Sequence, residues 1–170
     1  IVDFLRTENI KVDGRIKSFK TKKGNNIPIE IEGVGEIDLI FIDEVNKLIY
    51  VGECKHNRSR FDMNNWKRDY SNFESKYETQ LSNKEKWVND NLAVVLEHFE
   101  VLYNSSIDFT DYGITGAFFI NAPTIYMFNG KYRAYTFTDL IDIVNGKFVD
   151  TVFRFTNENT KATFNINHPY

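Results

Sequence analysis

The chain has 170 residues, 42% of them hydrophobic and 15% aromatic, and a net charge of −3 at neutral pH. This composition is typical of a single folded domain and excludes an intrinsically disordered protein. The acidic balance argues against binding of nucleic acid through bulk positive charge, and no apolar run approaches the roughly 20 residues that span a bilayer. The single cysteine, Cys54, excludes an internal disulfide and favours a reducing, cytoplasmic setting.

The N-terminal part of the chain predicts a short helix followed by strands. Residues 1–9, "IVDFLRTEN", have helical spacing of apolar side chains and begin in mid-pattern, as expected for a piece of a longer protein. The stretches 11–19 and 27–35 read as strands, and Gly24-Asn25 between them predicts a hairpin turn. No repeat or linker interrupts the chain, so we expect residues 1–170 to form one domain.

Two further strands are predicted within residues 35–55, "GEIDLIFIDEVNKLIYVGECK". Both runs are apolar on both faces, which is typical of strands in the middle of a covered sheet. A four-residue loop at 44–47 pairs Ile42 with Ile49 and Ile40 with Val51, so that aliphatic side chains stack across the hairpin. A five-residue loop would shift this register by one residue.

Three charged residues stand at the ends of these strands. The same register places Asp38 opposite Glu53, and Lys55 shares their face because side chains alternate along a strand. Two adjacent carboxylates repel each other, and Mg²⁺, with Mn²⁺ as a substitute, would neutralise them. The carbonyl of Cys54 is a further candidate ligand, whereas its side chain is expected to be a small buried hydrophobe on the opposite face. Lys55 could orient a metal-bound water and touch a phosphate, which suits phosphodiester hydrolysis.

A long amphipathic helix is predicted after this hairpin. Residues 61–103 contain neither proline nor glycine, and we expect one long helix ending near 103, preceded by a shorter helix at about 61–70. The apolar residues recur at spacings near three, four and seven: Phe73, Tyr77, Leu81, Val88, Leu92, Val95 and Phe99.

The C-terminal third predicts a strand, a hairpin and a helix. Residues 112–123 read as a buried strand, and 124–137 as a hairpin that turns at Gly130. A short helix follows, with Thr138 as its N-cap and Gly146 just past its end. The tail reads as a strand followed by loosely held polar chain. This order of elements predicts an α/β domain with a mixed central sheet flanked by helices.

The segment "GEID", followed on the next strand by "VGECK", resembles the PD-(D/E)xK superfamily of restriction-endonuclease-like phosphodiesterases. Asp38 corresponds to the first acidic residue of the motif, Glu53 to the second and Lys55 to the lysine. The resemblance covers about residues 1–121 and implies a core of helix, β-meander, long helix and strand. It leaves residues 122–170 as a C-terminal hairpin, helix and tail with no assigned role.

The chain departs from the family pattern at two points. Ile37 replaces the proline that gives the motif its name. The first helix often supplies an assisting acid in the family, and only Asp3 or Glu8 could serve here.

The resemblance implies a Mg²⁺-dependent endonuclease acting on DNA, in restriction, phage defence or repair. The helix after the motif lysine often faces the site in this family. Gln80 is therefore expected as a catalytic residue near the metal-bound water or a phosphate, and Lys84 as a contact to backbone phosphate. The basic residues that follow Lys55 are further candidates for nucleic-acid binding: His56, Arg58 and Arg60.

Two alternatives remain open at this point. The domain could keep the nuclease fold but act as a nucleic-acid-binding or structural module without turnover, although degenerate members usually lose one residue of the triad. The hairpin could also be the core of an unrelated α/β binding domain. Residues 69–170 hold 8 basic and 13 acidic residues, so specificity is expected to come from other regions of a longer chain or from a partner subunit such as a second copy.

Overall fold

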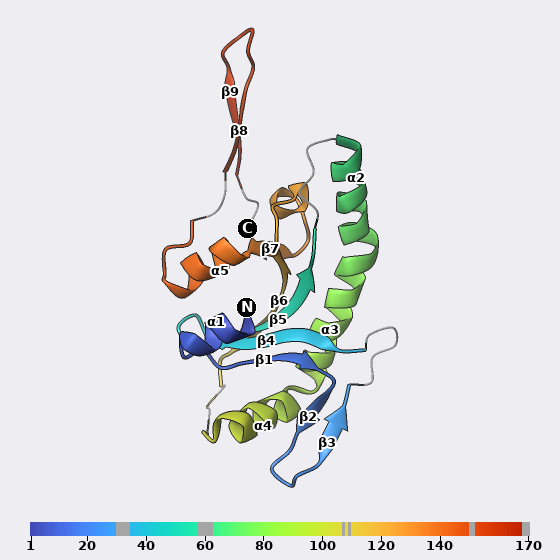
Figure 1. The fold of residues 1–170 in the computed structure, drawn as a ribbon, viewed down its shortest axis with the longest axis vertical. Helices are drawn as coiled ribbons and strands as arrows, with labels where there is room; N and C mark the ends of the chain where they lie inside the picture. Colours follow the sequence, from blue (N-terminus) through green and yellow to red (C-terminus); the bar gives the residue numbers. More distant parts are fainter. Residues whose placement is uncertain (30–34, 58–62, 107, 109, 150–151, 168–170) are drawn as a thin grey trace.

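A mixed five-stranded sheet lies at the centre of the protein, with strands in the spatial order β1-β4-β5-β6-β7 (Figure 1). The structure is a computed structural model that describes residues 1–29, 35–57, 63–106, 108, 110–149 and 152–167. The five strands are β1 (Val12–Ile16), β4 (Ile37–Asp43), β5 (Leu48–Lys55), β6 (Gly113–Ile120) and β7 (Arg133–Thr136). β4 runs antiparallel to both of its neighbours, β1 and β5, whereas β6 is parallel to β5 and β7 is parallel to β6. The predicted α/β class with a mixed sheet is confirmed.

The β4–β5 hairpin has the predicted register. Ile42 pairs with Ile49 and Ile40 with Val51, which requires the four-residue loop at 44–47. Side chains at alternate positions contribute to two separate hydrophobic clusters, one on each face of the sheet. The hairpin is therefore buried on both sides, as the apolar sequence of both strands predicts.

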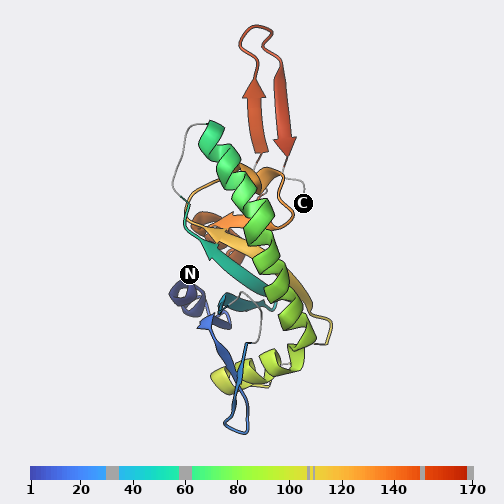
Figure 2. The same cartoon turned by 90° about the vertical axis from the view of Figure 1, so that its right-hand side faces the viewer.

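Helices cover both faces of the sheet. The long helical rod along one face consists of α2 (Met63–Asn72), a π-helical turn (Phe73–Tyr77) and α3 (Glu78–Asp90), as Figure 2 shows. Leu81 and Val88 on α3 are fully buried against the sheet. The opposite face is covered by α1 (Val2–Thr7) and α5 (Phe137–Val144).

The helical region differs from the prediction at both ends. The expected short helix near 61–70 continues through the π-helical turn into α3 without a break. The expected single helix up to 103 ends at Asp90, because Asn91 adopts a non-helical backbone with φ −120°. α4 (Leu92–Tyr103) then starts in a new direction and packs against β2 (Ser18–Lys20).

A buried histidine fixes α4 to the sheet. The backbone N–H of Lys20 donates to His98 Nδ1 at 2.9 Å, so the ring proton resides on Nε2, which donates to Asp13 Oδ2 at 2.9 Å. Burial raises the pKa of Asp13, but the hydrogen bonds from His98 and from the Gly14 N–H outweigh it and hold the pKa below its ordinary value. The sequence offered no visible partner for His98.

The predicted hairpin over residues 124–137 is wrong. Ile125–Phe128 forms a 3₁₀ turn instead of a strand, and β7 pairs in parallel with β6 instead of with residues 124–129. Tyr126 holds this turn against the helical rod, because its buried ring stacks on Phe73 at 4.4 Å between centroids and its hydroxyl donates to Glu78 at 2.8 Å. Gly130 allows the chain to pass close by, since a Cβ there would overlap the Tyr126 ring.

Two small hairpins lie outside the central sheet. β2 pairs with β3 (Asn26–Pro28) through a turn in which Gly24 has φ +79°, so the predicted turn is confirmed. The single strand expected over 11–19 is divided at Lys17, and much of the second expected strand, residues 30–34, lies outside the described residues. β8 (Val152–Thr156) and β9 (Thr163–Asn167) form a hairpin that projects from the body, where a loose polar tail after β8 was expected.

No helix in the described part of the chain is long and apolar enough to cross a membrane.

Helix α5 begins two residues earlier than predicted. Thr136, not Thr138, is the N-cap: its hydroxyl accepts from the Asp139 N–H at 3.2 Å, and its own N–H donates to the Asp139 carboxylate at 2.6 Å. These reciprocal hydrogen bonds form a capping box. Gly146 lies just past the helix with φ +66°, as predicted.

We expect Thr136→Ala to lower the free energy of unfolding by about 1 kcal/mol, because the Asp139 N–H loses its acceptor. Thr138→Ala is the matched control, since Thr138 is exposed on the first turn of the same helix. Urea denaturation of both variants measures the difference. Equal losses at the two positions would show that the capping box does not stabilise the helix.

Candidate active site

Asp38 and Glu53 lie on neighbouring strands and face the long helix. The register Leu39–Gly52 continues by one residue to bring Asp38 opposite Glu53 on the same side of the sheet. The side chain of Glu53 is 5% exposed and that of Asp38 is 23% exposed. Two carboxylates at this depth require positive charge nearby, because each raises the cost of ionising the other.

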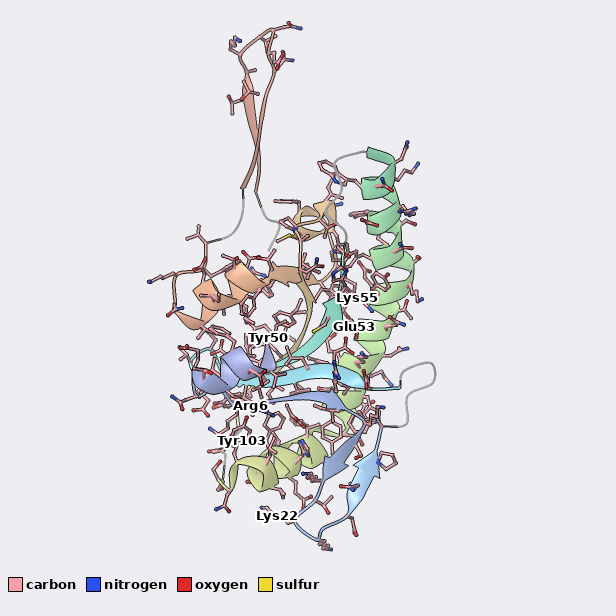
Figure 3. All side chains as sticks on the ribbon, in the orientation of Figure 1. Arg6, Lys22, Tyr50, Glu53, Lys55 and Tyr103 are labelled. Atoms are coloured by element: carbon pink, nitrogen blue, oxygen red, sulfur yellow. The ribbon has the colours of Figure 1, made fainter. Side chains whose placement is uncertain are left out.

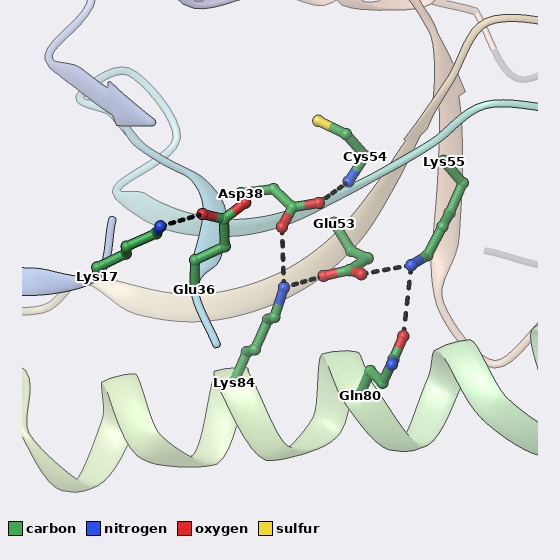
Figure 4. Close-up of polar contacts among 8 residues, drawn as sticks. All are labelled: Lys17, Glu36, Asp38, Glu53, Cys54, Lys55, Gln80 and Lys84. Atoms are coloured by element: carbon green, nitrogen blue, oxygen red, sulfur yellow. Dashed lines mark hydrogen bonds and ion pairs between the residues drawn. The ribbon is translucent and has the colours of Figure 1, made fainter. Parts of the chain in front are cut away.

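Lys84 supplies that charge from α3. Its Nζ donates to Asp38 Oδ1 at 3.0 Å and also to Glu53 Oε2, so a single ammonium bridges the two carboxylates (Figure 4). The Lys84 side chain is 4% exposed. The sequence predicted Lys84 as a contact to backbone phosphate, and that role stays a prediction; its contacts in the structure are with the acidic pair.

Lys55 binds the other side of Glu53. Its Nζ donates to Glu53 Oε1 at 2.5 Å and to Gln80 Oε1 at 3.3 Å, and it lies 4.3 Å from the centre of the Tyr77 ring. Figure 3 places Glu53 and Lys55 between the end of β5 and the helical rod. Gln80 and Lys55 therefore meet, and the cluster contains two carboxylates and two ammonium groups. The expected role of Gln80 near a metal-bound water or a phosphate stays a prediction.

Cys54 contributes its backbone to the site. Its N–H donates to Asp38 Oδ2 at 2.9 Å and fixes the orientation of that carboxylate. The side chain lies on the opposite face, but it is exposed, so the expectation of a buried hydrophobe is wrong. Desolvation of the sulfur, together with the charges of Asp38 and Glu53, raises the pKa of the thiol to about 11. The predicted role of its carbonyl as a metal ligand remains a prediction.

A pocket of about 300 Å³ opens onto this cluster. Besides the acidic pair, its lining includes Lys17, Glu36, Gln80 and Lys84. Glu36 was not singled out from the sequence, although it stands two residues before Asp38 and therefore points to the same side. Its carboxylate lies 4.0 Å from Lys17 Nζ and is 40% exposed.

A second pocket, of about 610 Å³, lies on the other side of Asp38 and is lined by Arg6 and Arg15. Asp3 lines this pocket, whereas Glu8 lines a different one that does not include Asp38. Asp3 is therefore the better placed of the two candidates for an assisting acid. Asp38 therefore lines both pockets, and each pocket is also lined by basic side chains.

The other predicted binding residues lie beyond Lys55. His56 is exposed and lines a polar pocket of about 230 Å³ with Asn57 and Arg68. Arg58 and Arg60 lie outside the described residues. This polar pocket also includes Tyr77, whose ring contacts Lys55, so it adjoins the acidic cluster.

Oxygen ligands for a small cation are present in the cluster. The Asp38–Glu53 pair matches the preference of Mg²⁺ for one or two carboxylates completed by waters and phosphate oxygens. Among the described residues no group of three or more His, Cys, Asp and Glu side chains forms a metal cage. Two carboxylates would fit an open cation site that is completed by waters and phosphate oxygens.

Arg15 has a strained backbone opposite Asp38. Gly14 pairs with Leu39 and Ile16 with Ile37, and Arg15 between them has φ +54°. Of the described non-glycine residues with positive φ, Arg15 is the one inside a strand. Such strain costs on the order of 1 kcal/mol or more and is often found at functional sites.

Arg15→Gly is expected to be more stable than Arg15→Ala by about 1 kcal/mol, because glycine adopts positive φ without the steric cost of a Cβ. At Lys17, whose φ is not positive, the order should reverse, with Lys17→Ala the more stable variant. Urea denaturation of the four variants checks both orders. Equal stability of the two Arg15 variants would contradict the strain.

Comparison of the chain with models of known protein families, with curated proteins and with solved structures finds no match. The chemistry of the site is then the evidence on function: two paired carboxylates, two ammonium groups and an amide lie at one end of the central β4–β5 hairpin, with basic side chains around the opening.

Proposed function

We propose that this protein is a metal-dependent nuclease that hydrolyses phosphodiester bonds in DNA. The observation that carries the proposal is the convergence of Asp38, Glu53 and Lys55 at one end of the central β4–β5 hairpin, which is buried on both faces. The order of helix, antiparallel meander, helical rod and parallel strand supports it, because this is the core that the PD-(D/E)xK resemblance implies.

Asp38 and Glu53 would hold the cation, Mg²⁺ or its substitute Mn²⁺, with the Cys54 carbonyl as a further ligand. A cation held there supplies Lewis acidity at a phosphoryl oxygen and lowers the pKa of a bound water. The Cys54 N–H supports this assignment, since it fixes the Asp38 carboxylate from behind. Oriented ligands of this kind bind metal with less reorganisation.

Lys55 would orient the attacking water and stabilise charge on the scissile phosphate. Gln80 and the Tyr77 ring hold its ammonium from two sides, so its position does not depend on Glu53 alone. Preorganised charge of this kind is the main protein contribution to phosphoryl chemistry. Gln80 also has an amide N–H₂ group that could donate to a water or a phosphate oxygen.

The nucleic-acid strand would pass over Asp38 between the two pockets. Lys17, Arg15 and Arg6 line these pockets and offer phosphate contacts on a protein of net negative charge. DNA as the substrate, and a place in restriction, phage defence or repair, are the parts of the proposal that rest on the family resemblance.

A second candidate function is a nuclease-fold module that binds nucleic acid or serves a structural role without turnover. Lys84 favours it, because an ammonium bridging both carboxylates already neutralises the pair. A cluster that is balanced in this way can persist as a purely structural element of a buried sheet.

A cleavage assay separates the two candidates. The protein would be incubated with supercoiled, linear and single-stranded DNA in Mg²⁺, Mn²⁺ or EDTA. We expect metal-dependent cutting that Lys55→Ala lowers roughly a hundredfold or more, because the charge beside the phosphate is lost.

Lys86→Ala is the matched control, since Lys86 lies on α3, its side chain is 78% exposed, and its ammonium lies 3.3 Å from Asp90. It should cut like the wild-type protein. Cutting that survives both Lys55→Ala and EDTA would refute the proposed mechanism. Absence of cutting, with DNA still bound, would favour the module without turnover.

A further inference from the structure

We propose that Lys84 is a positioning residue that occupies the cation position of the site, so that a divalent metal binds only by displacing its ammonium from Asp38 and Glu53. The inference rests on the proposed function, because it assigns the same two carboxylates to the metal. It makes Lys84 the residue that sets the metal affinity of the site.

The competition follows from shared atoms. The Lys84 ammonium hydrogen-bonds to Asp38 Oδ1 and Glu53 Oε2, one oxygen from each carboxylate. Of the remaining oxygens, Asp38 Oδ2 accepts the Cys54 N–H and Glu53 Oε1 accepts Lys55. A cation that bridges the carboxylates therefore needs the oxygens that Lys84 holds.

The position of Lys84 in α3 keeps its ammonium between the two carboxylates. Lys84 lies three residues after Leu81 and four before Val88, both of which are fully buried, so the helix surface that carries it faces the sheet. A buried ammonium needs hydrogen-bonded counter-charge, and the acidic pair provides it. Removal of Lys84 would leave two carboxylates facing each other without the ammonium that bridges them, while Lys55 stays bonded to Glu53.

The same geometry gives opposite effects on the metal-free protein and on metal binding. Without the ammonium the free protein is destabilised by carboxylate repulsion. A divalent cation relieves that repulsion and no longer has to displace a competing charge. Loss of Lys84 should therefore weaken the free protein and strengthen the binding of metal, a combination that an ordinary structural ion pair would not produce.

The test measures Mn²⁺ binding directly, through the electron paramagnetic resonance signal of free Mn²⁺. We expect Lys84→Met to bind Mn²⁺ about tenfold more tightly than the wild-type protein, or better. Its melting temperature without metal should be lower, and Mn²⁺ should raise it by more than in the wild-type protein.

Two control variants accompany it. Lys86→Met removes an exposed lysine from the same helix and should bind Mn²⁺ like the wild-type protein. Asp38→Asn should weaken Mn²⁺ binding in the wild-type and the Lys84→Met backgrounds, which ties the bound ion to this site.

The outcomes distinguish the inference from the function on which it rests. Mn²⁺ affinity that is unchanged or weaker in Lys84→Met, with binding still sensitive to Asp38→Asn, would overturn the role of Lys84 and leave the metal site standing. Absence of Mn²⁺ binding in the wild-type protein and in folded Lys84→Met would overturn the metal site, and the role of Lys84 with it.

A measurement on the wild-type protein covers the case in which Lys84→Met does not fold. Mg²⁺ titration followed by carbon NMR of the lysine side chains should shift the Cε signal of Lys84 and leave that of Lys86 in place. A Lys84 signal that stays unmoved while the carboxyl carbons of Asp38 and Glu53 respond would refute displacement.

Discussion

The repulsion between two carboxylates at one end of the central β4–β5 hairpin is the constraint on which the rest of the site depends. Asp38 and Glu53 are placed together by the hairpin register, and two negative charges this close repel each other. Two ammonium groups compensate this charge: Lys84 on α3 binds both carboxylates, and Lys55 on β5 binds Glu53. This arrangement compensates the negative charge of the acidic pair with two buried or half-buried ammonium groups.

The hydrophobic core provides the rigidity that such a site requires. The strands that carry the acidic pair are buried on both faces, between the helical rod on one side and α1 with α5 on the other. Strands held in this way fix their side chains more accurately than a loop can. The strain at Arg15 persists for the same reason, since the residues before and after it are paired to β4.

The hairpin register and the placement of the acidic pair with Lys55 could be predicted, because each follows from the period of a strand. Gln80 was expected near the site from the family resemblance, and its contact with Lys55 was not predicted. The burial of Lys84 had a signal that was missed: it stands within the apolar stripe between Leu81 and Val88. The parallel pairing of β7 could not be predicted from residues 124–137 alone. The preceding turn packs through Tyr126 against Phe73, which is distant in the sequence. The same is true of the contact between His98 and Asp13.

The π-helical turn at Phe73–Tyr77 makes the helical rod sensitive to single-residue changes in length. A π turn contains one residue more than the regular helix, so the segments before and after it differ in phase by about 100°. Deletion of one residue there would restore a regular helix but rotate α2 about its axis relative to α3. The Tyr70 hydroxyl, which now donates to the Asn129 carbonyl, would then point elsewhere. Point substitutions on the exposed side of the rod should be tolerated far better than such a deletion, so chain length here is under tighter constraint than residue type.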